Sequence, residues 1–442
     1  MLFKGMRHSL LIGGPMAALL LASGTAACAV QPVSLTSAVS AHTSAVSSAS
    51  AVSSASAVSS AAANSAAVAS SHEPTPAALR AARLTSVALA SSRRGEGLFV
   101  NQVGARCEAL SGVTADGGAQ FRSASVITRW NCNGSAPVSW IAADSAGNAF
   151  AYGPSLFIAR SSAGPWRKSS QPGTVLSVSA VGRSVWMLLA RCRGAAMTPH
   201  GCVLHLVKSV DGGRIWQPVK SPQGAVTTGS ESGPAYEQAA GQTWLLRVGK
   251  SSAYLLAGPA GNNRGKPDSV ALWYTANAGA SWSKRRIDCG IHALSVSMAR
   301  APGGALVAVC ADEPSAGFQV KTTLVSSTGG RTWTLRAGCG FSPGCRDPLY
   351  FGYLGQVAAV SSRTAYLVGD RSSLLVTTDG GRRWHAVRPV VGDTSGGTYQ
   401  VTFLSRSVGV ALGQGGATSE NVDLFRTSDG GRTWSQVVPR LS

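Results

Sequence analysis

Residues 83–442 form a succession of short hydrophobic runs separated by turn-forming residues. In Tyr399–Pro439, apolar and polar positions alternate through YQVTFLSRSVGVALG, VDLFRTSDGGRTW and SQVVP. The stretch Gly355–Val390 repeats this order with GQVAAVSSRTAYLVG, SLLVTTDGGRRW and HAVRPV. Alternation with a period of two between turn signals is typical of β-strands, so each stretch is predicted to hold four strands. No long helical periodicity interrupts these runs, and we expect an all-β fold.

A short turn rich in Asp and Gly precedes the fourth predicted strand and recurs along the chain. Five copies read SVDGGRIW, TANAGASW, SSTGGRTW, TTDGGRRW and TSDGGRTW, and two weaker copies, TADGGAQF and SSAGPW, lie upstream. The aromatic residues that end the seven copies are separated by 45, 50, 66, 51, 51 and 50 residues. A repeat of this period indicates a solenoid, an array or a propeller. Seven four-stranded units predict a seven-bladed β-propeller.

Turn chemistry accounts for every position of this octapeptide. Glycine tolerates the positive φ of a tight turn, and the Ser, Thr and Asp side chains can bond backbone N–H groups within it. The aromatic side chain is large enough to pack between neighbouring units. We therefore interpret these residues as structural and expect no catalytic residue among them. They are Asp116, Phe121, Trp166, Asp211, Trp216, Asn277, Trp282, Thr328, Trp333, Asp379, Trp384, Asp429 and Trp434.

These turns resemble the Asp-box, or BNR, repeat, whose pattern is roughly Ser/Thr-x-Asp-x-Gly-x-Thr-Trp. The regular period is most similar to that of propellers related to photosystem II stability and assembly factors; sialidases and sortilin-type receptors share the box. The resemblance covers nearly all of residues 83–442. It is weakest at Thr114–Phe121 and at Ser161–Trp166, where the Asp is missing and Pro165 intrudes. It implies that the boxes lie away from the usual ligand face.

A glycoside hydrolase is the hypothesis that the residues favour least. The resemblance to sialidases would imply three converging arginines and a Tyr nucleophile with a Glu partner. It would also imply a Phe/Tyr-Arg-Ile-Pro motif before the first box, and this motif does not occur in the chain. Tyr236 and Glu237 are adjacent, and adjacent strand residues point to opposite faces. The chain has only 19 acidic residues, four of which lie in the boxes. We expect a protein that binds rather than catalyses.

The amino-terminal residues predict export. Lys4 and Arg7 precede the apolar stretch SLLIGGPMAALLLASGTAAC, the order of a secretory signal, so residues 1–27 are predicted to be a signal peptide. The end of this stretch resembles a bacterial lipobox, although Thr25 replaces the usual Leu, and we expect lipidation of Cys28, with simple cleavage as the alternative. Residues 28–82 are rich in Ala, Ser and Val and predict a low-complexity tether. The propeller follows at 83–442.

The cysteine count agrees with export. Apart from Cys28, eight cysteines remain, and an even number in an exported protein suggests disulfides. Sequential pairing is the simplest of many possible connectivities: Cys107–Cys132, Cys192–Cys202, Cys289–Cys310 and Cys339–Cys345. No Cys-x-x-Cys or paired His spacing occurs, so we expect neither a metal site nor a cofactor.

The formal net charge of +20 favours anionic partners. Many cations lie in the boxes or on the strand after the aromatic residue, which predicts a basic rim. Such a rim can simply discourage strand-to-strand aggregation. It can also attract an anionic wall polymer, phospholipid headgroups or an acidic protein. We do not expect nucleic acid as a partner, because the chain is exported and lacks a binding motif.

One long loop, Ala337–Tyr353, combines a predicted disulfide with residue types common in interaction hot spots. The residues that we expect to bind are Phe341, Arg346, Asp347 and Tyr350. The alternative is a stapled insertion whose aromatic rings fold onto the blade. The leading hypothesis is a monomeric, non-catalytic scaffold or assembly factor for an envelope protein, touching the membrane only through its lipid anchor. Binding of an anionic wall polymer or glycan by the rim is the alternative.

Overall fold

The computed structural model describes residues 79, 82–161, 164–171, 173–191, 202–222, 226–227, 245–257, 270–289, 293, 295–312, 319–338, 349, 352–370, 372–387, 398–414 and 422–442. The predicted signal, Cys28 and the predicted tether lie outside these residues. The chain divides into two units, Met1–Val68 and Ala69–Ser442, and only the second contains described residues.

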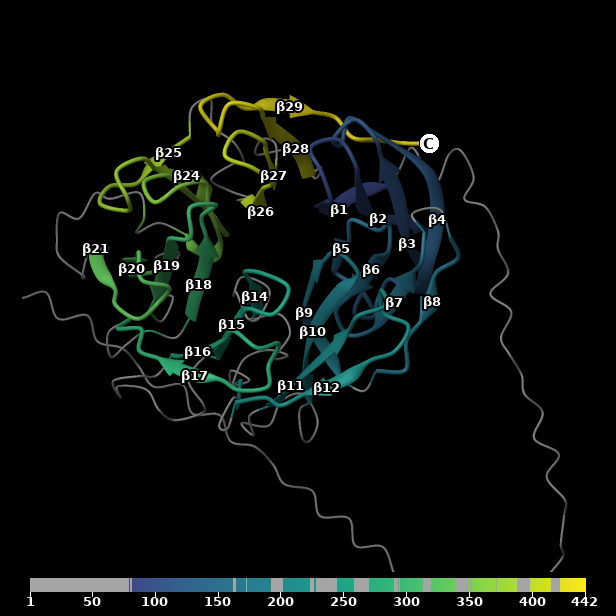
Figure 1. Cartoon of the computed structure of the whole chain (residues 1–442). Helices are drawn as coiled ribbons and strands as arrows, with labels where there is room; N and C mark the ends of the chain where they lie inside the picture. Colours follow the sequence, from purple (N-terminus) through teal and green to yellow (C-terminus); the bar gives the residue numbers. More distant parts are fainter. Residues whose placement is uncertain are drawn as a thin grey trace, which may run out of the picture. The chain divides into compact units, whose positions relative to one another are not determined.

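Seven antiparallel sheets follow one another around a ring in Ala69–Ser442, and each is one blade (Figure 1). Blade 1 consists of β1 (Arg83–Leu89), β2 (Gly95–Val103), β3 (Arg106–Thr114) and β4 (Gln120–Asn131). Blade 2 consists of β5 (Trp140–Ala143), β6 (Ala149–Tyr152), β7 (Leu156–Ala159) and β8 (Arg167–Lys168). Blade 3 consists of β9 (Thr174–Val181), β10 (Ser184–Arg191), β11 (Cys202–Ser209) and β12 (Gln217–Val219), and the short β13 (Val226–Thr227) also pairs with β11. Blades 4 and 5 consist of β14 (Leu245–Arg247), β15 (Ala253–Ala257), β16 (Ala271–Thr275) and β17 (Ser283–Arg285); and β18 (Ser295–Arg300), β19 (Leu306–Ala311), β20 (Lys321–Ser326) and β21 (Thr334–Gly338). Blades 6 and 7 consist of β22 (Tyr353–Ala359), β23 (Ala365–Asp370), β24 (Ser372–Thr377) and β25 (His385–Ala386); and β26 (Thr398–Phe403), β27 (Gly409–Gln414), β28 (Val422–Thr427) and β29 (Ser435–Val437).

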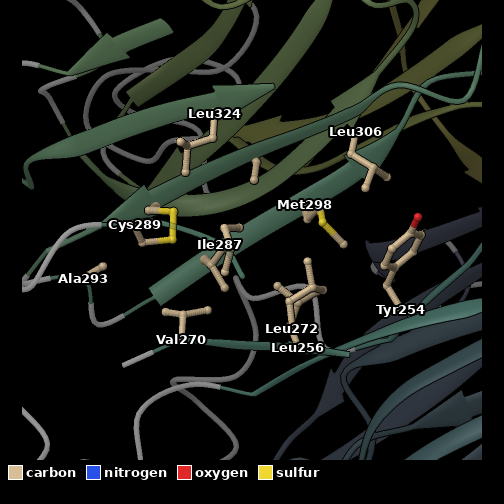
Figure 2. Close-up of a cluster of buried hydrophobic side chains, with 13 residues drawn as sticks. Tyr254, Leu256, Val270, Leu272, Ile287, Cys289, Ala293, Met298, Leu306 and Leu324 are labelled. Atoms are coloured by element: carbon tan, nitrogen blue, oxygen red, sulfur yellow. A yellow bond between two sulfur atoms is a disulfide. The ribbon is translucent and has the colours of Figure 1, made fainter. Parts of the chain in front are cut away.

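The hydrophobic core lies between neighbouring blades rather than at one centre. Alternate strand residues point to opposite faces, so a second strand that is buried on both faces, such as β10 or β19, is a nearly continuous hydrophobic run. Between blades 4 and 5, Leu256 and Leu272 pack with Met298 and Leu306, next to the Cys289–Cys310 disulfide (Figure 2). Six comparable buried clusters occur in the described part of the ring.

The aromatic residue that ends a box ties its blade to the preceding one. The indole N–H of Trp384 in blade 6 donates to the Thr323 hydroxyl of blade 5, with an N···O distance of 3.0 Å. Trp166 of blade 2 likewise donates to the Ser111 hydroxyl of blade 1 at 2.9 Å. These two aromatic residues therefore combine apolar packing with a hydrogen bond across the blade interface, whereas the Trp434 indole donates to Gly431 within its own box.

The first strands form a second set of links, which also closes the ring. The Ser297 hydroxyl of blade 5 accepts the Val357 N–H of blade 6, and the Gln356 side chain accepts the Val401 N–H of blade 7. Gln400 of blade 7 both accepts the Val87 N–H and donates to the Val87 carbonyl of blade 1, at 3.1 and 2.8 Å. A single amide side chain thus joins the last blade to the first.

Blade 1 carries one additional strand. The C-terminal β30 (Arg440–Leu441) pairs in parallel with the start of β4, and the Ser442 N–H donates to the Phe121 carbonyl at 2.9 Å. The C-terminal residues therefore cover the outer edge of the first blade.

The structure confirms the predicted seven-bladed all-β propeller. Two expected disulfides are present, Cys107–Cys132 and Cys289–Cys310. Cys192, Cys339 and Cys345 and the side chain of Cys202 lie outside the description, so the other two pairs remain predictions. None of the described segments is a helix that is long and apolar enough to cross a membrane.

Candidate functional site

The box turns have one hydrogen-bonding frame, which blade 3 illustrates. The Ser209 hydroxyl accepts the Gly213 N–H at 2.8 Å and donates to the Asp211 carboxylate at 2.6 Å. The same carboxylate oxygen accepts the N–H groups of Arg214 and Ile215 at 2.9 and 3.1 Å. The hydrogen bonds from the Ser209 hydroxyl and the Ile215 N–H hold the pKa of Asp211 below its ordinary value. This carboxylate stabilises the turn and is not a proton donor near neutral pH.

Five further turns keep this frame. Asp116, Asp379 and Asp429 accept backbone N–H groups in the same way, and so do the amide oxygen of Asn277 and the hydroxyl of Thr328. A serine or threonine at the first position accepts the N–H of the fifth residue in each of the five. The fifth residue is a glycine with φ between 77 and 103°, a conformation that other residues adopt at a cost.

The turn between the first and second strands meets the box at the same end of the blade. The Gly380 N–H donates to the Arg363 carbonyl at 2.8 Å, and the Gly430 N–H donates to the Ser407 carbonyl at 2.8 Å. Blades 1, 3 and 4 repeat this bond through Gly117, Gly212 and Ala278. Both kinds of turn therefore lie on one face of the ring, which we call the box face.

The box face is strongly cationic in the described residues. All seven blades supply at least one exposed arginine or lysine from these turns: Arg93, Arg94, Arg160, Arg183, Arg214, Lys250, Arg300, Arg331, Arg363, Arg382, Arg383, Arg406 and Arg432. The carboxylates on this face are fewer, and none is fully exposed: Asp116, Asp144, Asp211, Asp379 and Asp429. The sequence predicted the cations within the boxes but missed those of the first turns, because only the structure brings the two turns together.

The predicted binding loop lies mostly outside the described residues. Phe341, Arg346, Asp347 and Tyr350 are among the undescribed residues, so their expected role remains a prediction. The base of the loop is visible, because the buried Lys321 ammonium donates to the carbonyls of Leu349 and Gly352 at 2.9 and 2.7 Å. Burial lowers the pKa of Lys321 to about 7, while these carbonyl acceptors favour its charged form.

Glu96 is a buried acid that the sequence analysis did not single out. The second residue of β15 and of β23 is a tyrosine whose hydroxyl donates to the next blade's box: Tyr254 to Gly329 at 3.0 Å and Tyr366 to Gly430 at 2.8 Å. Strand register places Glu96 at the same position of β2. Glu96 is 3% exposed, and its carboxyl oxygens have no hydrogen-bond partner among the described residues. Burial raises its pKa to about 8.

By this register, Glu96 faces blade 2, whose box is the most divergent. In blade 6, the first residue of the second strand, Ala365, pairs with Thr377, the first residue of the box. The equivalent residue of blade 2, Ala149, pairs with Ala159. The octapeptide of blade 2 is therefore Ala159–Trp166, ARSSAGPW. It starts two residues before the SSAGPW match found from the sequence. It has lost the hydroxyl at its first position and the carboxylate at its third.

A hollow of about 450 Å³ adjoins this divergent box. It is bordered by residues of blade 2, including the third strand, the box and the edge strand β8, and by Gly213 of the blade 3 box. Three cations lie among these residues, Arg160, Arg167 and Lys168. The sequence signal was the loss of the Asp and the insertion of Pro165, but these changes alone do not predict a hollow.

No protein-family model and no curated protein sequence matches the chain. Among solved structures it is similar to YCF48 from Cyanidioschyzon merolae, with 16% identity over 67% of this chain and 83% of that one and a TM-score of 0.42. A structure of YCF48 bound to D1 peptide gives 14% identity, coverage of 68% and 80%, and a TM-score of 0.42. A Trypanosoma rangeli sialidase mutant displaying trans-sialidase activity gives 12% identity, coverage of 60% and 48%, and a TM-score of 0.36. The chain is a seven-bladed β-propeller with similarity to propellers of different activities, and these similarities assign it none of them.

Proposed function

We propose that the chain is a non-catalytic binding propeller of the cell envelope that holds an anionic polymer against its box face. The observation that carries this proposal is the exposed cations that all seven blades supply to one face. Clustered like charges repel one another, and they also raise the local concentration of an oppositely charged partner. The carboxylates of the same face are fewer, five against thirteen cations, so they offset only part of this field.

The arrangement favours a partner with many negative charges over a small anion. A single exposed ion pair contributes about 0–1 kcal/mol, and salt at about 0.1 M screens exposed charges beyond about 10 Å. Cations spread over a ring of blades therefore bind firmly only when one molecule meets several of them. Guanidinium groups also match the geometry of phosphate and carboxylate oxygens.

The positions of the box acids, of Glu96 and of Glu108 favour a binding role. Glycosidases of the common type place two carboxyl groups on either side of the scissile bond. Here the box carboxylates bond their own turns, Glu96 is buried between blades, and Glu108 pairs with Arg129 at 2.6 Å. None of these groups forms such a pair at an open site.

A binding assay with two matched variants tests the proposal. Isolated cell-wall polymer would be titrated with the purified chain at low and high salt. Arg382→Gln with Arg383→Gln removes two charges from the box face, and Arg83→Gln with Arg106→Gln removes two from the opposite ends of their strands. We expect the first variant to bind several-fold more weakly and the second to bind like the wild type. Binding that neither salt nor the first variant weakens would contradict the proposal.

A protein scaffold is the second candidate, and the fixed base of the Ala337–Tyr353 loop favours it. Lys321 ties Leu349 and Gly352 at this base to blade 5 through their carbonyls, and a partner that meets an ordered base loses less entropy on binding. A pull-down from solubilised envelope at high salt distinguishes the two candidates. One protein retained at fixed stoichiometry would support the scaffold, whereas salt-sensitive retention of polymer supports the box face.

Export and anchoring complete the proposal. The two disulfides are typical of oxidising compartments. We propose that residues 1–27 direct export and that Cys28 carries a lipid anchor. Metabolic labelling with a radioactive fatty acid should mark the wild type and leave Cys28→Ser unlabelled. Equal labelling of both proteins would exclude Cys28 as the anchor site.

A further inference from the structure

The hollow beside the blade 2 box adjoins the turn that departs most from the frame of the other boxes. In an intact box the hydroxyl of the first residue and the oxygen of the third bind the N–H groups that follow, as Ser209 and Asp211 do in blade 3. Ala159 and Pro165 remove one acceptor and one donor from this scheme in blade 2.

The positions of the cations also differ from those in the other boxes. The second residue of the other six octapeptides is uncharged: Ala115, Val210, Ala276, Ser327, Thr378 and Ser428. Blade 2 has Arg160 there, and Gly164 at the sixth position, where four boxes carry an arginine. The arginine of this octapeptide therefore precedes the turn instead of following it, and the sixth position, a glycine, carries no side chain.

The charges around the hollow are of one sign. Arg160, Arg167 and Lys168 border it together with hydroxyl side chains, among them Ser161 and Ser169. No acidic residue is among the described residues that line it. Guanidinium, ammonium and hydroxyl groups are all hydrogen-bond donors, and donors of net positive charge that border a concave surface suit an oxyanion.

We infer that this hollow binds a phosphate group. Three cations can balance more than one negative charge, and a phosphate offers several acceptor oxygens in different directions to the arginine forks and the serine hydroxyls. The inference rests on the proposed function for the source of that group, which would be a phosphate-containing polymer lying on the box face. The hollow then selects phosphate-rich over carboxylate-rich polymers, which the spread charges of the face do not distinguish.

Three charge-neutralising variants of the full chain test this site: Arg160→Gln, Lys168→Gln and, as the matched control, Arg331→Gln in the intact box of blade 5. All three residues are exposed, so the variants should fold, and thermal unfolding checks this. Inorganic polyphosphate and polyglutamate of similar charge number are the two probes. We expect Arg160→Gln and Lys168→Gln to weaken polyphosphate binding about tenfold, the loss of one charge-assisted contact, and Arg331→Gln to change it less than about twofold. Polyglutamate binding should fall equally and slightly in all three.

The outcomes distinguish phosphate binding in the hollow from binding by the box face as a whole. Equal weakening of polyphosphate binding by all three variants would overturn the phosphate site but leave the proposed function standing, because the face alone would then account for binding. Equal affinity of the wild type for the two probes would also overturn the site. Failure of the wild type to bind either probe would overturn the site and the proposed function together.

Discussion

Replacing Glu96 by glutamine should remove a pH-dependent loss of stability that the structure builds into the interface of blades 1 and 2. Burial raises the pKa of this carboxyl from 4.5 to about 8. A folded-state pKa above the unfolded one means that the folded protein binds the proton more tightly. The stabilising contribution is therefore complete below about pH 4.5 and is lost as the pH rises toward 8. At about 1.4 kcal/mol per pH unit, the difference between these values sets an upper limit of about 5 kcal/mol.

Chemical denaturation at pH 5 and pH 8 measures this effect. A neutral glutamine fills nearly the same space as a protonated glutamate and has no proton to lose. We therefore expect the two proteins to differ by less than about 1 kcal/mol at pH 5, and Glu96→Gln to be more stable by up to about 4 kcal/mol at pH 8. The denaturant dependence should be equal in the two proteins if the same surface is exposed on unfolding.

A stability difference that is the same at both pH values would refute the reasoning, because it would show that Glu96 is solvated or paired in the folded protein. Glu96→Tyr provides a second comparison, since it installs the side chain that Tyr254 and Tyr366 use at this position. Its stability should also lack the loss between pH 5 and pH 8, whatever the packing cost of the larger ring.

Three further variants test other parts of the ring. Thr377→Val removes the hydroxyl that bonds both the Gly381 N–H and Asp379, and should destabilise the protein by about 1–3 kcal/mol in denaturant titration; no change would show that the hydroxyl does not hold the turn. Lys321→Met should raise hydrogen exchange of the Ala337–Tyr353 loop above that of the wild type, because the carbonyls at its base lose their donor; unchanged exchange would contradict that role. Gln400→Leu should cost more stability than Gln356→Leu, since it removes three interblade hydrogen bonds rather than one; equal losses would show that the additional hydrogen bonds of Gln400 add no stability.

The sequence predicts the fold of this protein well because each blade repeats the same local signals. The position of a box, a Gly with positive φ and an aromatic residue can be seen within eight residues, and seven copies leave few alternatives to a propeller. The box face was predicted only in part. Arg363 and Arg406 lie far in the sequence from the boxes of their own blades, and the hydrogen bonds from Gly380 and Gly430 to the adjacent turns are long-range consequences of strand pairing.

The hollow and Glu96 could not be predicted for a different reason. Glu96 lies in GEGLFV, a short strand-like run in which one acid normally marks a solvent-facing position, and only the register with β3 shows that it faces the next blade. The hollow depends on the register of Ala159 against Ala149. Strand pairing decides which residue begins the octapeptide, and a local sequence pattern does not contain that pairing.

The closure of the ring by the C-terminal residues determines the order in which the protein can be completed. Leu84, Phe99 and Leu110 of blade 1 are covered by apolar residues of blade 7, and β30 covers the outer edge of the same blade. A chain emerging from the ribosome or from a translocon makes blade 1 first, yet its partner surface comes last. Until then, the apolar side of blade 1 is exposed to solvent. A translation arrest or a proteolytic cut before residue 398 would therefore leave an aggregation-prone arc of blades rather than a smaller stable propeller.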